Sequence, residues 1–168
     1  TRNVDYHTAQ AISAGDGAGA AVVSMSDDTS KWYFADQQTV TASEYYGTMY
    51  TDGQSIRPKP PLLGHSLVYS PPFFQITDQG LKGFKNFGAI EALTAVTELL
   101  AKNDLTAADV TFMPHQTSSV LIKYWVDHLD PPPAQVATTI EKFANITVAI
   151  HTLNLAWFED KGHIEKDN

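Results

Sequence analysis

Pro114-His115-Gln116 is the first segment whose residue types could do chemistry. It follows a short apolar run, Val110–Met113, and precedes a helical pattern, so the imidazole is expected at the carboxyl end of a strand. The positive end of the following helix would disfavour imidazolium. A neutral imidazole there would donate an N–H to a developing oxyanion rather than act as a base. The structural alternative is a loop histidine that hydrogen-bonds to backbone.

Asn145 is the second candidate. It stands between Phe143-Ala144 and an apolar helical pattern that starts at Thr147. An Asn at a helix entrance is commonly an N-cap, whose side-chain oxygen accepts a backbone N–H. In the same position its amide N–H₂ could point into a pocket as a second donor. Asn145-Ile146-Thr147 also matches a glycosylation sequon, which we discount because nothing in the sequence indicates secretion.

Helices that could position these residues are indicated by hydrophobic periodicity. Apolar residues at steps of three and four predict a long helix over Asp78–Lys102 and a second over Thr117–His128. The segment Thr147–Phe158 is apolar almost all round, which is typical of a buried helix. A further helix is expected to begin at Pro131 and to run to about Phe143.

Strands are predicted at Ala20–Met25, within Lys31–Tyr46 and at Val110–Met113, so strands and helices together indicate an α/β protein. Between residues 56 and 74, five of the nine prolines predict a long surface loop. The run Gly15–Gly19 precedes a strand rather than a helix. This order argues against a dinucleotide-binding loop and favours close backbone packing.

Composition bounds the function classes. The chain has 168 residues, is 43% hydrophobic and 18% charged, and carries a formal net charge of −8, which suits one globular domain. An acidic surface repels phosphate backbones, so we predict no nucleic-acid binding. No apolar run is long enough to cross a bilayer, and the expected location is the cytoplasm. The polar start, without Met or a signal pattern, indicates a fragment or a processed product.

Cysteine and histidine usage argues against a metal site. The chain has no cysteine, which excludes disulfides, thiolate ligands and a cysteine nucleophile within it. The remaining histidines lack metal-ligand spacing, and His128 and His151 are expected to be partly buried structural residues on helices. These histidines are His7, His65, His128, His151 and His163. We therefore predict neither a metal nor another cofactor.

Three segments, in their order and spacing, resemble the C-terminal half of ketoacyl-ACP synthase III, a family of the thiolase superfamily. They are the Gly-Asp-Gly-Ala-Gly-Ala run Gly15–Ala20, the Pro-His-Gln segment Pro114–Ser118 and the Asn-containing segment Ala144–Thr147. The resemblance runs from about Asp5 to Ile164. It implies that residues 1–168 form a thiolase-like half, a mixed β-sheet with a buried helix and covering helices, incomplete at both ends and lacking the N-terminal Cys-bearing half.

The resemblance also implies a function. The family condenses thioesters carried on CoA or acyl carrier protein by a decarboxylative Claisen reaction, in which a His and an Asn stabilise an enolate that attacks an acyl-Cys. Carried over, these catalytic residues are His115 and Asn145, with Phe84, Thr117 and Ser118 as substrate-binding residues at the pantetheine tunnel. The chain alone would not be competent because it has no Cys. The resemblance further implies a homodimer of the full enzyme.

Departures from the family pattern support an alternative, a non-catalytic thiolase-like subunit or fragment that stabilises an active partner. Ser118 replaces the family's Asn, and Val120 stands where relatives place an Arg toward the carrier protein. Ala144 replaces the Gly before the catalytic Asn, and a branched Ile146 follows it. A more remote alternative is an unrelated nucleotide- or metal-binding domain. Acyl chain length, extender unit, pathway and oligomeric state do not follow from the sequence.

Overall fold

A computed structural model of the protein describes residues 14–28, 32–51, 56–57, 68–69 and 74–164. The helical elements are the α-helices α1 (Asp78–Gly83), α2 (Ala92–Lys102), α3 (Ser119–His128), α4 (Ile140–Phe143) and α5 (Ile150–Asp160), the π-helix η4 (Phe84–Glu91), and the 3₁₀ turns η2 (Ser43–Tyr45), η5 (Ala107–Asp109) and η6 (Thr147–Ala149). The strands are β1 (Met49–Thr51), β2 (Ile56–Arg57), β3 (Val68–Tyr69), β4 (Phe74–Ile76), β5 (Thr111–Phe112) and β6 (Gln135–Val136). None of the helices in the described part of the chain is both long and apolar enough to cross a membrane.

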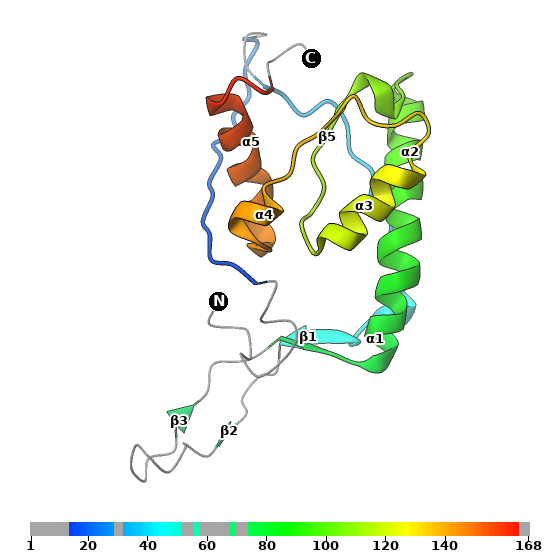
Figure 1. Ribbon diagram of the computed structural model, residues 1–168, viewed down its shortest axis with the longest axis vertical. Coiled ribbons are helices and arrows are strands. Elements are labelled where there is room, and N and C mark those ends of the chain that lie inside the picture. The colour runs from blue at the N-terminus through cyan, green and yellow to red at the C-terminus, as the bar shows by residue number, and fades with distance from the viewer. Residues whose placement is uncertain (1–13, 29–31, 52–55, 58–67, 70–73, 165–168) are drawn as a thin grey trace.

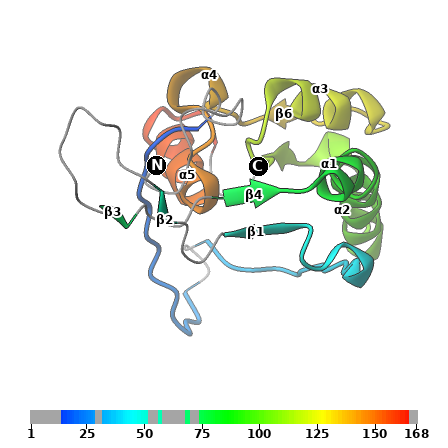
Figure 2. The same ribbon diagram turned by 90° about the horizontal axis from the view of Figure 1, so that it is seen from below.

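The described strands form three separate pairs. The pairs β1–β4 and β2–β3 are antiparallel, whereas β5 and β6 are parallel, with Thr111 opposite Gln135 (Figure 2). The Ala137 N–H extends the parallel pair by donating to the Phe112 carbonyl at 2.9 Å. Strands of both directions therefore occur, as in an α/β protein, but they lie in separate two-stranded sheets, and no sheet among the described strands mixes the two directions. The parallel pair matters most for the site, because the segment after β5 leads to His115 and the segment after β6 leads through α4 to Asn145.

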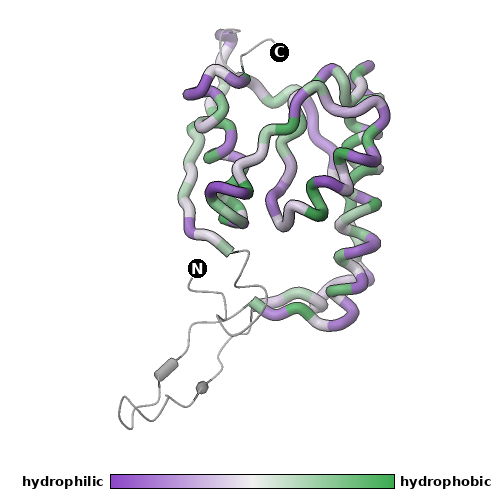
Figure 3. The backbone as a smooth tube through the Cα atoms, viewed as in Figure 1, coloured by the Kyte–Doolittle hydropathy of each residue, from purple (hydrophilic) through white to green (hydrophobic). Residues whose placement is uncertain are grey.

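The predicted helix over Asp78–Lys102 is confirmed as the continuous run of α1, η4 and α2, which forms one side of the molecule in Figure 1. Thr77 caps it, since its Oγ1 accepts the Gly80 N–H at 3.1 Å. Figure 3 shows hydrophilic and hydrophobic residues alternating along this run, as an amphipathic helix requires. In the middle, the Trp125 indole N–H from α3 lies 3.2 Å from the carbonyl oxygens of Gly88 and Ala89. This contact binds α3 to the π-helical turn.

The two N-terminal strands predicted from residue type are wrong. Ala20–Met25 has no strand, and its side chains stand in solvent, with Met25 fully exposed. Residues 32–42 are irregular, and the described part of the predicted Lys31–Tyr46 strand ends in η2. Asp36 tethers this irregular segment to Lys102 at the end of α2, at 2.8 Å. β-Prone residues form a strand only when a neighbour completes the hydrogen-bond ladder, and no described residue does so here.

The proline-rich loop predicted for residues 56–74 is described only in part. Ile56–Arg57 and Val68–Tyr69 pair as β2 and β3, and Phe74 begins β4. The other residues of the predicted loop lie outside the described ones. The pairing that is described shows that part of this segment is a short ribbon rather than loop.

The helix predicted from Pro131 to Phe143 is also wrong over most of its length. Gln135–Val136 form β6, and only Ile140–Phe143 are helical. Three successive prolines, Pro131–Pro133, lack backbone N–H groups, and each disfavours the α conformation in the residue before it. The chain therefore stays extended and pairs with β5 before it turns into the short helix α4.

The core around the last helix is built from Ile146, Ala149 and Ile150, with Phe143 and Leu153 packed against them. The predicted helix over Thr147–Phe158 is confirmed as η6 and α5. The expectation that it is buried on every side is wrong. Ile150 is fully buried, but Val148 is 91% exposed. Burial follows the face that packs on the described core, and the other face of α5 has no described layer against it.

The glycine run Gly15–Gly19 lies against this core, as the expectation of close backbone packing requires. A Cβ on Gly17 would lie 2.7 Å from Ile146 Cδ1. Cβ atoms on the glycines before and after it would overlap Phe143 and Thr152. Only glycine permits this approach of the chain to α4 and α5.

Candidate functional site

His115 lies in the loop between β5 and α3, at the carboxyl end of the strand as predicted. Its imidazole is half-buried, and its ring centroid is 6.1 Å from that of His151 on the first turn of α5. Burial lowers the pKa of His115 below its ordinary value of 6.5, and the charge of His151 lowers it further. The ring is therefore neutral near pH 7, the protonation state in which one nitrogen donates and the other accepts.

The direction of this pKa shift agrees with the sequence-based expectation, but its cause differs. Burial dominates, whereas the expected cause was the helix terminus alone. Sequence reasoning expected His151 to be a structural residue and did not include it in the site. It is exposed, as is His128, so the expectation that both are partly buried is wrong. Its spacing six residues after Asn145, on the helix that Asn145 enters, is the signal that could have brought it into the site.

Asn145 joins α4 to η6, and the residue directly before η6 is Ile146, which is its N-cap. The Asn145 Oδ1 accepts the Thr147 N–H at 2.9 Å, and the Asn145 carbonyl accepts the Gly15 N–H at 2.9 Å. The second bond continues a parallel bridge between Asn145 and Ala14. Among the described residues, no atom accepts from the Asn145 Nδ2 group. The N-cap role expected for Asn145 is therefore not what the structure shows, although its oxygen accepts the Thr147 N–H while the N–H₂ group can still donate.

Backbone strain brackets Asn145. Ala144 has φ 57° and ψ −157°, a region that essentially only glycine occupies, and Thr147 has φ 55° although it is β-branched. Strained residues persist only when the surrounding structure holds them, and they cluster at functional sites. The segment around Asn145 is therefore held in a conformation that its own residue types disfavour.

The three predicted substrate-binding residues do not share one cavity. Ser118 is the N-cap of α3, since its Oγ accepts the Leu121 N–H at 3.2 Å. Thr117 is two residues after His115, and its buried Oγ1 has no hydrogen-bond partner in the described part of the chain. Phe84 instead lines a hollow of about 710 Å³ near β1, together with Tyr45 and other residues. None of the other four predicted site residues lines that hollow.

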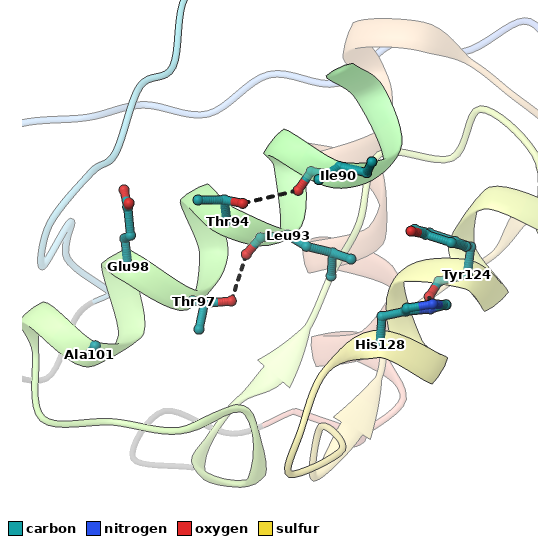
Figure 4. A pocket seen from close by; sticks show the side chains of 8 residues that line it. All are labelled: Ile90, Leu93, Thr94, Thr97, Glu98, Ala101, Tyr124 and His128. Carbon is teal, nitrogen blue, oxygen red and sulfur yellow. Dashed lines mark hydrogen bonds between the residues drawn. The ribbon is translucent and has the colours of Figure 1, made fainter. Parts of the chain in front are cut away.

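A second hollow, of about 570 Å³, lies between α2 and α3 (Figure 4). Its lining is mainly apolar, and the hydroxyls of Thr94 and Thr97 are occupied by the carbonyls of Ile90 and Leu93. At its edge, His128 Nδ1 forms a hydrogen bond of 2.8 Å with the Tyr124 carbonyl oxygen of its own helix, and the ring stacks on Tyr124. We take His115 and Asn145, which line neither hollow, as the candidate site, because they are the pair that the sequence singled out.

Residues 100–168 match the family model of the 3-oxoacyl-[acyl-carrier-protein (ACP)] synthase III C terminal. A β-ketoacyl-[acyl-carrier-protein] synthase III from Rickettsia bellii is 31% identical over 154 residues, which are 90% of this chain and 44% of the relative. The chain is like the C-terminal half of a ketoacyl-ACP synthase III. The resemblance inferred from the three sequence segments is thereby confirmed.

Further ketoacyl-ACP synthase III relatives agree. The enzyme of that name from Sulfurovum sp. (strain NBC37-1) is 32% identical over 155 residues, which are 87% of this chain and 42% of the relative. A crystal structure of the Thermus thermophilus β-ketoacyl-ACP synthase III superposes with a TM-score of 0.56 at 23% identity, covering 76% of this chain and 37% of that one. The thiolase-like α/β fold is thus confirmed. The chain spans less than half the length of the curated relatives it matches.

Proposed function

We propose that this chain is the His/Asn half of a ketoacyl-ACP synthase III-like condensing enzyme, with His115 and Asn145 as its catalytic residues. One observation carries the proposal. A neutral, half-buried imidazole lies against the first turn of α5, and the chain enters that helix through an Asn whose N–H₂ group has no described acceptor. Two uncharged donors near one helix end suit a developing thioester oxyanion.

The proposed reaction is a decarboxylative condensation. The bond between the malonyl carboxylate and the α-carbon breaks, CO₂ leaves, and the electron pair moves into the thioester to form an enolate. His115 and Asn145 donate hydrogen bonds to the enolate oxygen. The α-carbon then attacks an acyl thioester on a Cys, whose thiolate leaves. A preorganised donor pair lowers the barrier because it need not reorient as charge develops.

The Cys must come from another part of the assembly, because this chain has none. The proposed partner is an N-terminal Cys-bearing half, consistent with the chain's coverage of less than half of its relatives. The thioester would be carried on CoA or acyl carrier protein, in a cytoplasmic homodimer of the full enzyme. Thr117 and Phe84 would contact the carrier arm. Ser118 is a weaker candidate, since its hydroxyl already caps α3.

A specific observation favours the second candidate function, a non-catalytic thiolase-like subunit. Val120, at the position where the resemblance implies an Arg, is 79% exposed. This surface therefore presents an apolar side chain where a cation would attract an acidic carrier protein. A subunit that only stabilises a partner needs neither the carrier contact nor the donor pair, which makes the two functions separable by mutation.

The test is malonyl-thioester decarboxylation by the complete assembly. We expect His115→Ala to lower kcat by about 100- to 1,000-fold, the usual effect of removing one oxyanion donor. Asn145→Asp keeps the oxygen that accepts the Thr147 N–H but replaces the N–H₂ donor with a second oxygen, so it should lower kcat at least as much while the fold persists. His128→Ala, an exposed histidine on α3, is the control. Full turnover in both site variants would favour the non-catalytic subunit.

A further inference from the structure

Three buried polar side chains connect the His115 loop to α5. Gln116 and Asn154 are 0% exposed and Thr139 is 7% exposed. Gln116 Nε2 donates to Thr139 Oγ1 at 3.5 Å, and Thr139 Oγ1 donates to Asn154 Oδ1 at 2.5 Å. The three residues come from the loop after β5, the segment after β6 and the middle of α5. We call this chain of hydrogen bonds the polar brace.

The polar brace and the histidine pair meet the same face of α5. His151 and Asn154 are three residues apart on the helix, so their side chains lie on one side of it. His115 faces the first of them, while its neighbour Gln116 reaches the second through Thr139. Two successive residues of the loop, His115 and Gln116, are thus linked to the same face of α5. Asn145 is fixed near the start of the same helix by the bond that its Oδ1 accepts from the Thr147 N–H and by the buried Ile146 that follows it.

The polar brace is expensive for the fold. Two atoms of the polar brace, Gln116 Oε1 and Asn154 Nδ2, are buried without a hydrogen-bond partner among the described residues, as is Oγ1 of the neighbouring Thr117. Each such atom loses its hydration without full compensation, and apolar residues of similar shape would fill this space at lower cost. Buried unpaired polar atoms are rare in folded proteins and call for a reason. Here they lie beside the residue that carries the candidate imidazole.

We infer that Gln116, Thr139 and Asn154 are positioning residues that hold the His115 loop at a fixed place against α5, and so fix His115 relative to Asn145. This inference rests on the proposed function, since it assigns the polar brace to the alignment of the two proposed donors. Thr139 is its central member, because its single hydroxyl both accepts from Gln116 and donates to Asn154.

The experiment compares Thr139→Val, Thr139→Ser and Thr111→Val in the complete assembly. Thr139→Val keeps the shape and removes the hydroxyl, whereas Thr139→Ser keeps the hydroxyl. Thr111→Val is the matched control: it removes another hydroxyl that donates to a carboxamide, Gln135 Oε1 at 3.2 Å, within the β5–β6 pair and without a link to α5. Gln116→Met breaks the polar brace from the other side and replaces Thr139→Val if that variant does not fold.

Two readouts separate the polar brace from the proposed function. NMR titration of the His115 ring measures its environment directly, and turnover measures catalysis. We expect Thr139→Val to shift the His115 signals and its pKa and to lower kcat roughly 10- to 100-fold with KM unchanged, since small misplacements of catalytic groups have large effects. Thr139→Ser should restore both, and Thr111→Val should change neither.

Each other outcome is decisive. Unchanged His115 signals in Thr139→Val and Gln116→Met overturn the polar brace, even if His115→Ala shows that the proposed function holds. Equal effects of Thr139→Val and Thr111→Val on the His115 signals also overturn it, because the effect would then be general destabilisation. Shifted His115 signals with turnover that does not depend on His115 would support the physical link but refute the proposed function and the catalytic purpose inferred from it.

Discussion

Ala144→Gly should stabilise the protein. Ala144 has φ 57° and ψ −157°, a backbone conformation that costs a non-glycine residue about 1–3 kcal/mol. Glycine removes that strain but adds conformational entropy to the unfolded chain, at a cost of about 0.4–1 kcal/mol. The difference predicts a net gain of about 0.5–2 kcal/mol in the free energy of unfolding. For a chain of this length, Tm should rise by about 2–4 °C per kcal/mol.

Urea unfolding and calorimetry of the purified protein measure this gain. The control is Ala101→Gly, an exposed residue in the last turn of α2, where the same change should lower the free energy of unfolding by up to about 1 kcal/mol. The two substitutions must therefore move stability in opposite directions. If Ala144→Gly destabilises as much as Ala101→Gly, the strain argument fails, and with it the idea that the segment around Asn145 is held against its own preference.

Two further predictions follow from contacts made by α5 and α3. His151→Ala should raise the pKa of His115 toward 6.5 because it removes the nearby charge, and NMR titration measures it. Because the pKa of His115 is lower in the folded protein than in the unfolded chain, the unfolded chain takes up the proton first, and the free energy of unfolding falls as the pH drops below 6.5. His151→Ala should make that fall smaller. If the pKa of His115 does not move, His151 is not a cause of its depression. Trp125→Phe should lower the free energy of unfolding by about 1–3 kcal/mol, because it leaves the carbonyls of Gly88 and Ala89 without the indole donor. Urea unfolding tests it, and an unchanged midpoint and slope would show that these carbonyls need no donor from α3.

Local sequence patterns correctly predicted those helices and strands whose signal lies in consecutive residues. The periodicity from Leu81 to Leu100 required a helix, and the structure has one, although nothing in the pattern indicated that its middle is a π-helix. The short strand before Pro114 and the helix after Ser118 also followed from residue type. In these places the signal lies in the neighbours along the chain, where sequence reasoning has direct access to it.

The other parts of the fold and the site depend on contacts between residues that are far apart in the sequence. Ala20–Met25 has the composition of a strand but no described neighbour to pair with, and composition alone could not show that. Gln135–Val136 became a strand because β5 lies beside it, against the expectation of a helix. At the site, His115 and Asn145 were proposed from the sequence, but their relation to His151 depends on a contact across 36 residues of chain, which no local pattern encodes.

The glycine run beside the last helix has a consequence for how the sequence can vary. In an extended chain alternate side chains face the same way, so a Cβ on Gly15, Gly17 or Gly19 would clash with the helix layer, whereas Ala18 and Ala20 carry a Cβ and are exposed. Substitutions should therefore be rejected at every second position and accepted between them. Among functional variants, substitutions would then be tolerated at alternate positions of this segment. That pattern is typical of a β-strand, although the structure has no strand over these residues.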